Sequence, residues 1–186
     1  MPKIDASKIL IVSTHGFEQS ELEFPRDQLR AKGAEVHVAT LDGNAIKGWE
    51  GDDWGREAEA DLKVGDAKVA DYDALVLPGG QINPDLLRVD EDTLALIKDF
   101  AAQGKIIAAV CHAPWLLVEA GLASGRDMTS FHSIKTDVKN AGAHWVDQPV
   151  VVSNGIITSR NPNDLKDFVA KIVEEVEEGE HQRDAA

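Results

Sequence analysis

Four short apolar runs recur along the chain, and longer amphipathic segments separate them. The runs lie at Ile9–Val12, Val36–Ala39, Ala74–Leu77 and Ile106–Val110. Continuous runs of β-branched and aliphatic residues are typical of strands that are covered on both faces, as in parallel sheets. The pattern therefore predicts a parallel sheet that helices cover on both sides.

Glycines mark three places where a predicted helix ends shortly before a predicted strand. These are Gly33, Gly104 and Gly142, and the last precedes a short apolar stretch at His144–Val146. A glycine just past a helix adopts the left-handed conformation without steric cost. Three such joints indicate repeated crossovers, and so an α/β fold built on a layered sheet.

The C-terminal segment predicts one long amphipathic helix. Asn161 suits its N-cap and Pro162 its first position. Its apolar stripe consists of Leu165, Phe168, Val169, Ile172, Val173 and Val176. The stripe stops there, so we expect one domain over residues 1–176 and a frayed acidic tail over residues 177–186, its carboxylates facing solvent.

Two segments keep alternative interpretations. Residues 42–66 hold five glycines and two tryptophans, which fits either a hairpin or an extended excursion from the sheet. Pro25 lies within a helix expected from about Glu18 to Lys32. A proline there either kinks the helix or marks its true start, and the sequence leaves both open.

Length, charge and cysteine content limit the class of protein. The 186 residues suit a single domain, and 19 basic against 33 acidic residues give a net charge of −14. This charge argues against an unassisted nucleic-acid binder and against docking on anionic lipid. A single cysteine makes no intramolecular disulfide and no Cys-rich zinc site. With no secretory or membrane-spanning apolar run, a cytoplasmic location is expected.

Metal and phosphate motifs are missing. The histidines other than His112 form no H-x-x-x-H or H-E-x-x-H cluster, and no glycine-rich phosphate loop occurs. We therefore expect no metal site and no cofactor.

Cys111 is the first candidate for chemistry. A lone cysteine is most often a small buried hydrophobe. Here, however, it ends the run Ile106–Val110 and precedes a helix expected over Ala113–Ala120. A sharp strand-to-helix turn holds such a residue out of the sheet, at its carboxyl edge. Amides and the positive end of that helix would lower the pKa of the thiol and favour a nucleophilic thiolate.

Other polar residues are expected at the same edge. His112 either caps the turn or reaches the sulfur of Cys111. Gly79 and Gly80 follow the third run and either end a strand or offer backbone amides to an oxyanion. Glu18 and Glu21 follow the first run, where one is expected to be an ordinary helix N-terminal acid and the other could hydrogen-bond the sulfur.

Several longer motifs resemble those of one family. They are residues 17–21 (FEQSE), 71–80 (DYDALVLPGG), 109–117 (AVCHAPWLL), 137–143 (DVKNAGA) and 158–165 (TSRNPNDL). From about Lys8 to Val173 the chain resembles the PfpI/ThiJ superfamily of the class I glutamine-amidotransferase-like fold, and most of all its intracellular-protease and general-stress branch. The resemblance implies a flavodoxin-like three-layer sandwich, a nucleophile elbow and a homodimer or hexamer.

The resemblance also implies roles for single residues. Cys111 would be the nucleophile, His112 its partner, and Glu21 the acid that hydrogen-bonds the sulfur. Asp85 would be the acid that a neighbouring subunit supplies, although it lies one residue later after Gly80 than is usual in this branch. The stretch 155–165, where glutamine amidotransferases of this fold carry a histidine, has none, which disfavours glutamine hydrolysis.

The sequence thus predicts an enzyme. The leading hypothesis is a stress-related, cysteine-dependent hydrolase or lyase that acts on a small carbonyl or peptide substrate. Relatives are described as peptidases, deglycases and glutathione-independent glyoxalases, and a small elbow site suits methylglyoxal better than a folded polypeptide. The alternatives are a non-enzymatic peroxide sensor that uses oxidation of Cys111 and a holdase chaperone.

Overall fold

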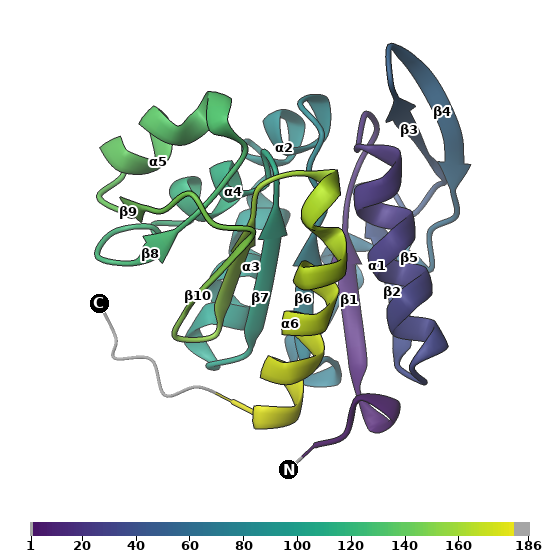
Figure 1. Ribbon diagram of the computed structural model, residues 1–186. Helices are drawn as coiled ribbons and strands as arrows, with labels where there is room; N and C mark the ends of the chain where they lie inside the picture. Colours follow the sequence, from purple (N-terminus) through teal and green to yellow (C-terminus); the bar gives the residue numbers. More distant parts are fainter. Residues whose placement is uncertain (1, 181–186) are drawn as a thin grey trace.

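A seven-stranded sheet runs through the middle of the molecule (Figure 1), in the order β10–β11–β7–β6–β1–β2–β5. The structure is a computed structural model that describes residues 2–180. The sheet strands are β1 (Lys8–Val12), β2 (Glu35–Thr40), β5 (Leu62–Lys63), β6 (Ala74–Leu77), β7 (Ile106–Val110), β10 (Val150–Ser153) and β11 (Ile156–Ser159). Neighbouring strands pair in parallel except β10, which is antiparallel to β11.

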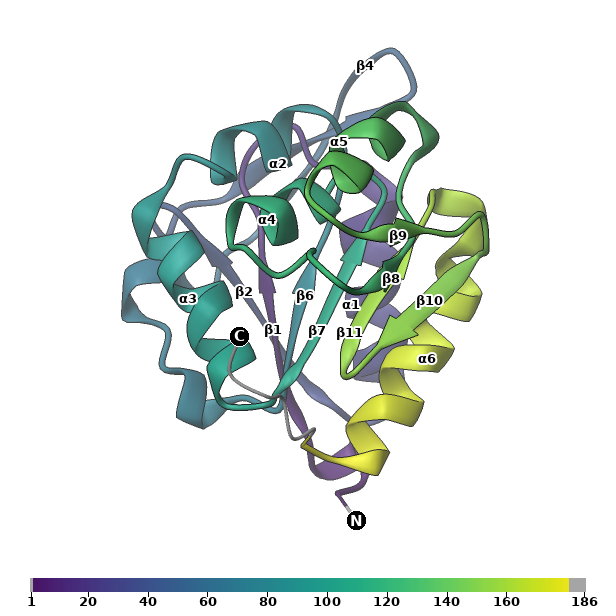
Figure 2. The ribbon, with the colours of Figure 1, turned by 90° about the vertical axis from the view of Figure 1, so that its left-hand side faces the viewer.

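Helices lie on both faces of this sheet. They are α1 (Gln19–Ala31), α2 (Ile82–Leu87), α3 (Glu91–Ala102), α4 (Pro114–Glu119), α5 (Lys135–Asn140) and α6 (Leu165–Glu178). Helices α1 and α6 cover one face, and α2 to α5 lie on the other (Figure 2). Short 3₁₀ turns lie at Ile4–Ala6, Val64–Asp66, Val69–Asp71, His132–Ile134 and Pro162–Asp164. The predicted three-layer α/β sandwich is confirmed.

The core occupies two layers, one on each side of the sheet. In β1, Leu10 and Val12 pack with the α3 and α4 side, whereas Ile9 and Ile11 pack with α1 and α6. All four side chains are fully buried. Because helices cover both faces of this strand, the run has no polar face.

Helix α1 runs through Pro25, so the proline does not mark its start. Because proline has no N–H, the carbonyl of Glu21 loses its usual helical partner. The first turn of α1 follows the loop 13–18 after β1 and lies at the carboxyl edge of the sheet, where Glu21 becomes buried.

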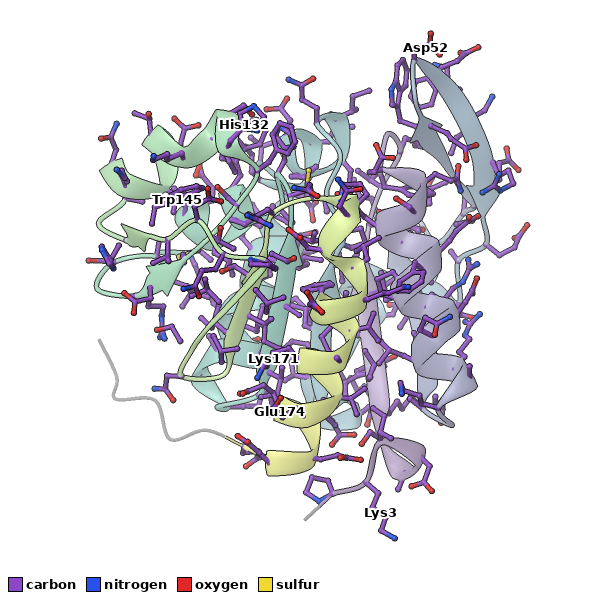
Figure 3. The ribbon with its side chains drawn as sticks, viewed as in Figure 1. Lys3, Asp52, His132, Trp145, Lys171 and Glu174 are labelled. Atoms are coloured by element: carbon purple, nitrogen blue, oxygen red, sulfur yellow. The ribbon has the colours of Figure 1, made fainter. Side chains whose placement is uncertain are left out.

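Residues 42–66 form the hairpin that was one of the two alternatives. Strands β3 (Ile46–Glu50) and β4 (Asp53–Ala58) pair antiparallel, and Trp49 packs edge-on against Trp54 at 5.4 Å between ring centroids. The chain then returns to the edge of the sheet as β5. The hairpin projects beyond the carboxyl ends of the central strands (Figure 1), and Asp52 lies at its tip (Figure 3).

The third helix–glycine–strand joint does not lead into the central sheet. Gly142 follows α5, but β9 (His144–Trp145) pairs with β8 (Asp127–Met128) in a separate two-stranded sheet. A strand does follow Gly142 as predicted, but it lies outside the central sheet, because a glycine ends a helix without deciding which strand the next segment meets. The joints at Gly33 and Gly104 lead into β2 and β7 as predicted.

The C-terminal helix differs from its prediction at both ends. Asn161 caps the 3₁₀ turn, accepting from the N–H of Asn163 at 3.0 Å, and α6 begins only at Leu165. It continues to Glu178, two residues beyond the apolar stripe. Glu175 is buried beside that stripe, so it does not belong to a solvated acidic face. The division into a domain and a tail stays a prediction, and residues 181–186 lie outside the described residues.

Among the helices of residues 2–180, none is both long and apolar enough to cross a membrane.

Candidate active site

Cys111 lies on a sharp turn between β7 and α4. Its φ of +64° is in the left-handed region, which a non-glycine residue adopts only at a cost of roughly 1–3 kcal/mol. Neighbouring backbone holds it there: its N–H donates to the carbonyl of Ser159 at 3.0 Å, and its carbonyl accepts from the N–H of Phe131 at 2.8 Å. The sulfur is thereby lifted out of the strand direction, in the manner expected of a nucleophile elbow.

His112 turns back toward the sulfur instead of pointing away from it. Its Nδ1 lies 3.2 Å from Sγ of Cys111, and its Nε2 lies 3.2 Å from Oγ of Ser133. The ring stacks on Phe131, with 4.8 Å between ring centroids, and meets Trp115 edge-on. Burial, and after it the charge of His132, lowers the pKa of His112, so the imidazole is neutral at neutral pH.

Glu21 is fully buried in the first turn of α1. Its Oε2 accepts from the N–H of Gly79 at 2.9 Å. Burial raises the pKa of this carboxyl to about 8, and the charge of Glu18 adds to the effect, whereas hydrogen bonding to Cys111 and to the two glycine amides works against it. The carboxyl therefore carries a proton at neutral pH, and a carboxylic acid beside a sulfur is a hydrogen-bond donor to it.

The surroundings of Cys111 correct one expectation from the sequence. Burial, followed by the negative charge of Glu21, raises the pKa of the thiol, while the amides of Gly80 and His112 lower it. The expected lowering of this pKa by the helix end does not prevail, because burial and, after it, Glu21 outweigh the amides at the start of the short helix α4. When Glu21 is protonated its repulsion is absent, so the first negative charge that forms at this pair meets no second charge beside it.

Gly79 and Gly80 bring the end of β6 against the elbow. A Cβ at Gly79 would collide with Oε2 of Glu21 and come within 2.6 Å of the Val110 carbonyl. Gly80 has a φ of +81° and packs against the loop between β1 and α1. The amides of Gly80 and His112 both hydrogen-bond toward the sulfur and thereby lower the pKa of the thiol, in opposition to burial.

Asn83 is a site residue that the sequence analysis missed. It is fully buried, and its Oδ1 accepts from the N–H of Thr14 at 2.8 Å. Its Nδ2 donates to the carbonyls of Pro78 and Gly79 at 2.9 and 3.2 Å. The side chain thus joins the loop after β1 to the loop after β6, and an asparagine just after a Pro-Gly-Gly turn gave no signal of this.

The two remaining acids lie in different places. Glu18 is partly buried and lines the same pocket as Cys111, and burial followed by the charge of Glu50 raises its pKa. Asp85 is exposed on α2 and lines a neighbouring pocket together with Trp115. Within residues 2–180 of one chain, no hydrogen bond or ion pair joins Asp85 to the Cys111–His112 pair.

A pocket of about 260 Å³ opens over the sulfur. Its walls come from the loops after β1, β6 and β7, the hairpin, and the segments at Phe131 and Pro162. Trp49, Phe131 and Pro162 were not predicted to line it. Trp49 had a signal, since it lies in a glycine-rich excursion, whereas the other two reach the site only through the tertiary fold.

A doubly covered parallel sheet with a cysteine on the elbow after a central strand defines a class of α/β proteins with a cysteine-centred site. The sequence profile of the DJ-1/PfpI family matches residues 7–175, and the chain belongs to this family. The resemblance drawn from the motifs is thereby confirmed.

Named relatives and a solved structure agree with this assignment. Deglycase TK1284 of Thermococcus kodakarensis is 39% identical over 166 residues, covering 89% of this chain and 97% of the relative. General stress protein 18 of Bacillus subtilis is 38% identical over 163 residues, covering 87% and 92%. The crystal structure of Drosophila melanogaster DJ-1beta superposes with a TM-score of 0.82 at 32% identity, covering 96% and 95%. The relatives support an enzyme of the PfpI type.

Proposed function

We propose that this chain is a stress-related, cysteine-dependent deglycase. Its substrates are small adducts of methylglyoxal-type carbonyls with amines or thiols. The observation that carries the proposal is the protonated, buried Glu21 beside Cys111, with the ring of His112 3.2 Å from the sulfur. A nucleophile, a proton acceptor and an acid thus meet in one small pocket.

The first step is addition of Cys111 to the carbonyl of the adduct. Sγ forms a bond to the carbonyl carbon, and the π electron pair moves onto oxygen. The thiol proton passes to Nδ1 of the neutral His112, which is near enough to accept it. The amides of Gly80 and His112 stabilise the negative oxygen.

The net reaction balances without an external oxidant or reductant. The adduct and one water give the free amine or thiol and a 2-hydroxy acid, because the ketone carbon is reduced as the carbinol carbon is oxidised. His112 and Glu21 supply and remove the protons that these steps need. A pocket of about 260 Å³ accommodates such an adduct, whereas a folded polypeptide enters only through an exposed side chain.

The test is a side-by-side assay of a methylglyoxal adduct, free methylglyoxal and a fluorogenic peptide with wild type and Cys111→Ser. We expect the adduct to be the best substrate and Cys111→Ser to lose turnover. Peptide hydrolysis as the leading activity would favour a peptidase, and a preference for free methylglyoxal would favour a glyoxalase. Full activity of Cys111→Ser would overturn the cysteine mechanism.

A second candidate function is peroxide sensing. The acid proton of Glu21 could hydrogen-bond the oxygen that a peroxide transfers to the sulfur, giving a sulfenate while the peroxide is reduced to water. Mass spectrometry after mild peroxide treatment tests this, and an unmodified Cys111 would count against it. Neutral His112, which a sensor does not need, favours catalysis.

We also propose that a second copy of the chain covers helix α2. Ile82, Leu86 and Val89 are 36%, 45% and 77% exposed and recur at helical spacing around Asp85. The dimer would bury this apolar face and bring Asp85 of one subunit toward the site of its partner. A cytoplasmic location and a possible hexamer stay predictions from the sequence.

Light scattering coupled to size-exclusion chromatography tests the dimer. We expect wild type to elute as a dimer or higher oligomer and Leu86→Glu to shift toward monomer. Trp54→Ser is the matched control, since it removes an equally exposed apolar side chain from the hairpin. A monomeric wild type would overturn the proposal.

A further inference from the structure

The lining of the Cys111 pocket holds acidic side chains and the neutral His112. Glu18 and Glu21 contribute carboxyl groups, and no lysine or arginine belongs to the lining among the described residues. Of the two acids, Glu21 is fully buried and already bonded to Gly79. Glu18 is the one that remains accessible to a ligand, and its carboxyl makes no hydrogen bond or ion pair with another residue of the described part.

An aromatic wall stands next to Glu18. Trp49 lines the same pocket, and its Nε1–H donates to the carbonyl of Gly51 at 2.9 Å. The Trp49 and Trp54 rings also pack edge-on against each other, with 5.4 Å between ring centroids. These contacts restrict the indole, so Trp49 is a fixed surface of the pocket.

Backbone hydrogen bonds hold this wall beside the loop that carries Glu18. The N–H of Trp49 donates to the carbonyl of Phe17 at 2.7 Å, and the N–H of Gly16 donates to the carbonyl of Lys47 at 2.8 Å. Glu18 and Trp49 therefore form an isolated parallel β-bridge. Beneath it, the buried amide of Gln19 accepts from the N–H of Arg56 at 2.7 Å and fixes β4.

We infer that Glu18 and Trp49 form a subsite for a positively charged part of the substrate, an ammonium or guanidinium group. A carboxylate beside an aromatic surface provides both an ion-pair partner and a cation–π surface. The inference rests on the proposed function, because it names the class of adduct that the same site prefers: a carbonyl adduct whose other end carries a cation.

The surrounding charges favour adducts whose far end is cationic and disfavour adducts whose far end is anionic. Glu50 lies close enough to raise the pKa of Glu18, and an incoming cation would relieve that repulsion. The neutral His112 offers no charge to an anion. An adduct with a carboxylate or phosphate at its far end would meet Glu18 with no lysine or arginine among the described lining residues. The cation of Arg56, outside the lining, is already paired with Glu23 and Glu50.

The first test measures charge preference at the sulfur without using turnover. Cys111 is the only cysteine of the chain, so its modification by a cationic and by an anionic methanethiosulfonate reports on this pocket alone. The ratio of the two rates is divided by the same ratio for a free thiol. We expect wild type to favour the cationic reagent by about tenfold and Glu18→Gln to lose most of that preference at 150 mM salt.

The matched control is Glu59→Gln, which removes one exposed acid just past β4 and changes the net charge equally. We expect it to keep the wild-type ratio, and Trp49→Leu to lower the ratio by about two- to fivefold. A wild-type ratio equal to that of the free thiol would overturn the subsite. So would an equal loss in Glu59→Gln, which would assign the preference to the overall charge of −14.

The second test uses three methylglyoxal hemithioacetals that share the reacting atoms. They are made from thiocholine, 2-mercaptoethanol and 3-mercaptopropionate, so only the remote charge differs. We expect wild-type kcat/KM to fall from the cationic to the neutral to the anionic adduct, and Glu18→Gln to compress this order. Turnover without charge preference would reject the subsite alone. Charge-selective labelling without turnover of any adduct would reject the deglycase and keep the subsite.

Discussion

The carboxyl of Glu21 accepts a 2.9 Å hydrogen bond from the backbone amide of Gly79, and this contact holds it beside the thiol of Cys111. The acid comes from the first turn of α1 and the sulfur from the turn after β7, and each alters the proton affinity of the other. The acid gains a proton because the site is dry, and the sulfur then has a donor instead of a second negative charge beside it. Stability and chemistry at this site therefore depend on the same proton.

Replacing Glu21 by glutamine should change how stability depends on pH. The pKa of the carboxyl is raised from 4.5 to about 8 in the fold, so the folded state holds a proton that the unfolded chain releases. The contribution of this bound proton to the free energy of unfolding is fully present below pH 4.5 and is lost as pH rises toward 8. The loss is at most about 5 kcal/mol. Urea unfolding of wild type and Glu21→Gln from pH 4.5 to 9 measures the difference.

The stability of wild type relative to Glu21→Gln should decrease with rising pH across this window. A difference that stays constant, or that grows in favour of wild type, would mean that Glu21 is ionised in the folded protein. Glu23→Gln is a suitable reference for a carboxyl on the same helix that pairs with Arg56 at the surface.

His112→Ala should lower kcat/KM for the methylglyoxal adduct by about 10²–10⁴-fold, the usual contribution of a positioned acid–base group. Ser133→Ala should cost at most about tenfold, because it removes only one neutral hydrogen bond to Nε2. Steady-state kinetics of both variants, with circular dichroism as a check on folding, make the comparison. Equal losses in the two variants would show that orientation of the ring matters more than its proton transfer.

The sheet could be predicted from the sequence more completely than the site. Ile9–Val12 and Ile106–Val110 could be assigned because continuous apolar runs are tied to burial on both faces. The pairing of β9 with β8 in a separate sheet could not be predicted, because strand pairing is a long-range property that no local turn encodes. The hairpin was one of two alternatives, since glycines allow a turn without specifying it.

The candidate site likewise has features that follow from the local sequence and features that depend on the folded chain. Cys111 and its elbow followed from a local strand-to-helix joint, and so did Gly79 at a neighbouring strand end. The pKa of the thiol did not, because a local dipole argument omits the burial of the sulfur and the acid of Glu21 that the fold brings from α1. The subsite wall at Trp49 depends on a backbone hydrogen bond to Phe17, which only the folded chain forms.

Asn83→Ala should destabilise the fold by about 1–3 kcal/mol. The truncation leaves the N–H of Thr14 without its buried acceptor and removes the donor that the carbonyls of Pro78 and Gly79 use. Asn140→Ala, at the exposed end of α5, is the control and should stay within about 0.5 kcal/mol. Urea midpoints at pH 7 decide, and equal midpoints for both variants would mean that water replaces the asparagine without loss.

Gly79→Ala should reduce both stability and activity. The backbone of Gly79 is not in the left-handed region, so the cost arises only from contacts: a Cβ would collide with the Glu21 carboxyl and approach Cβ of Cys111 to 2.7 Å. Overpacking of this kind costs roughly 1–3 kcal/mol, and it displaces the acid from the sulfur.

Gly121→Ala separates a loss of stability from a loss of activity, since its Cβ would meet nothing within 4 Å but its φ is +75°. We expect Gly121→Ala to lose stability while keeping kcat/KM, and Gly79→Ala to lose both. Full activity of a folded Gly79→Ala would show that the reaction tolerates a displaced Glu21.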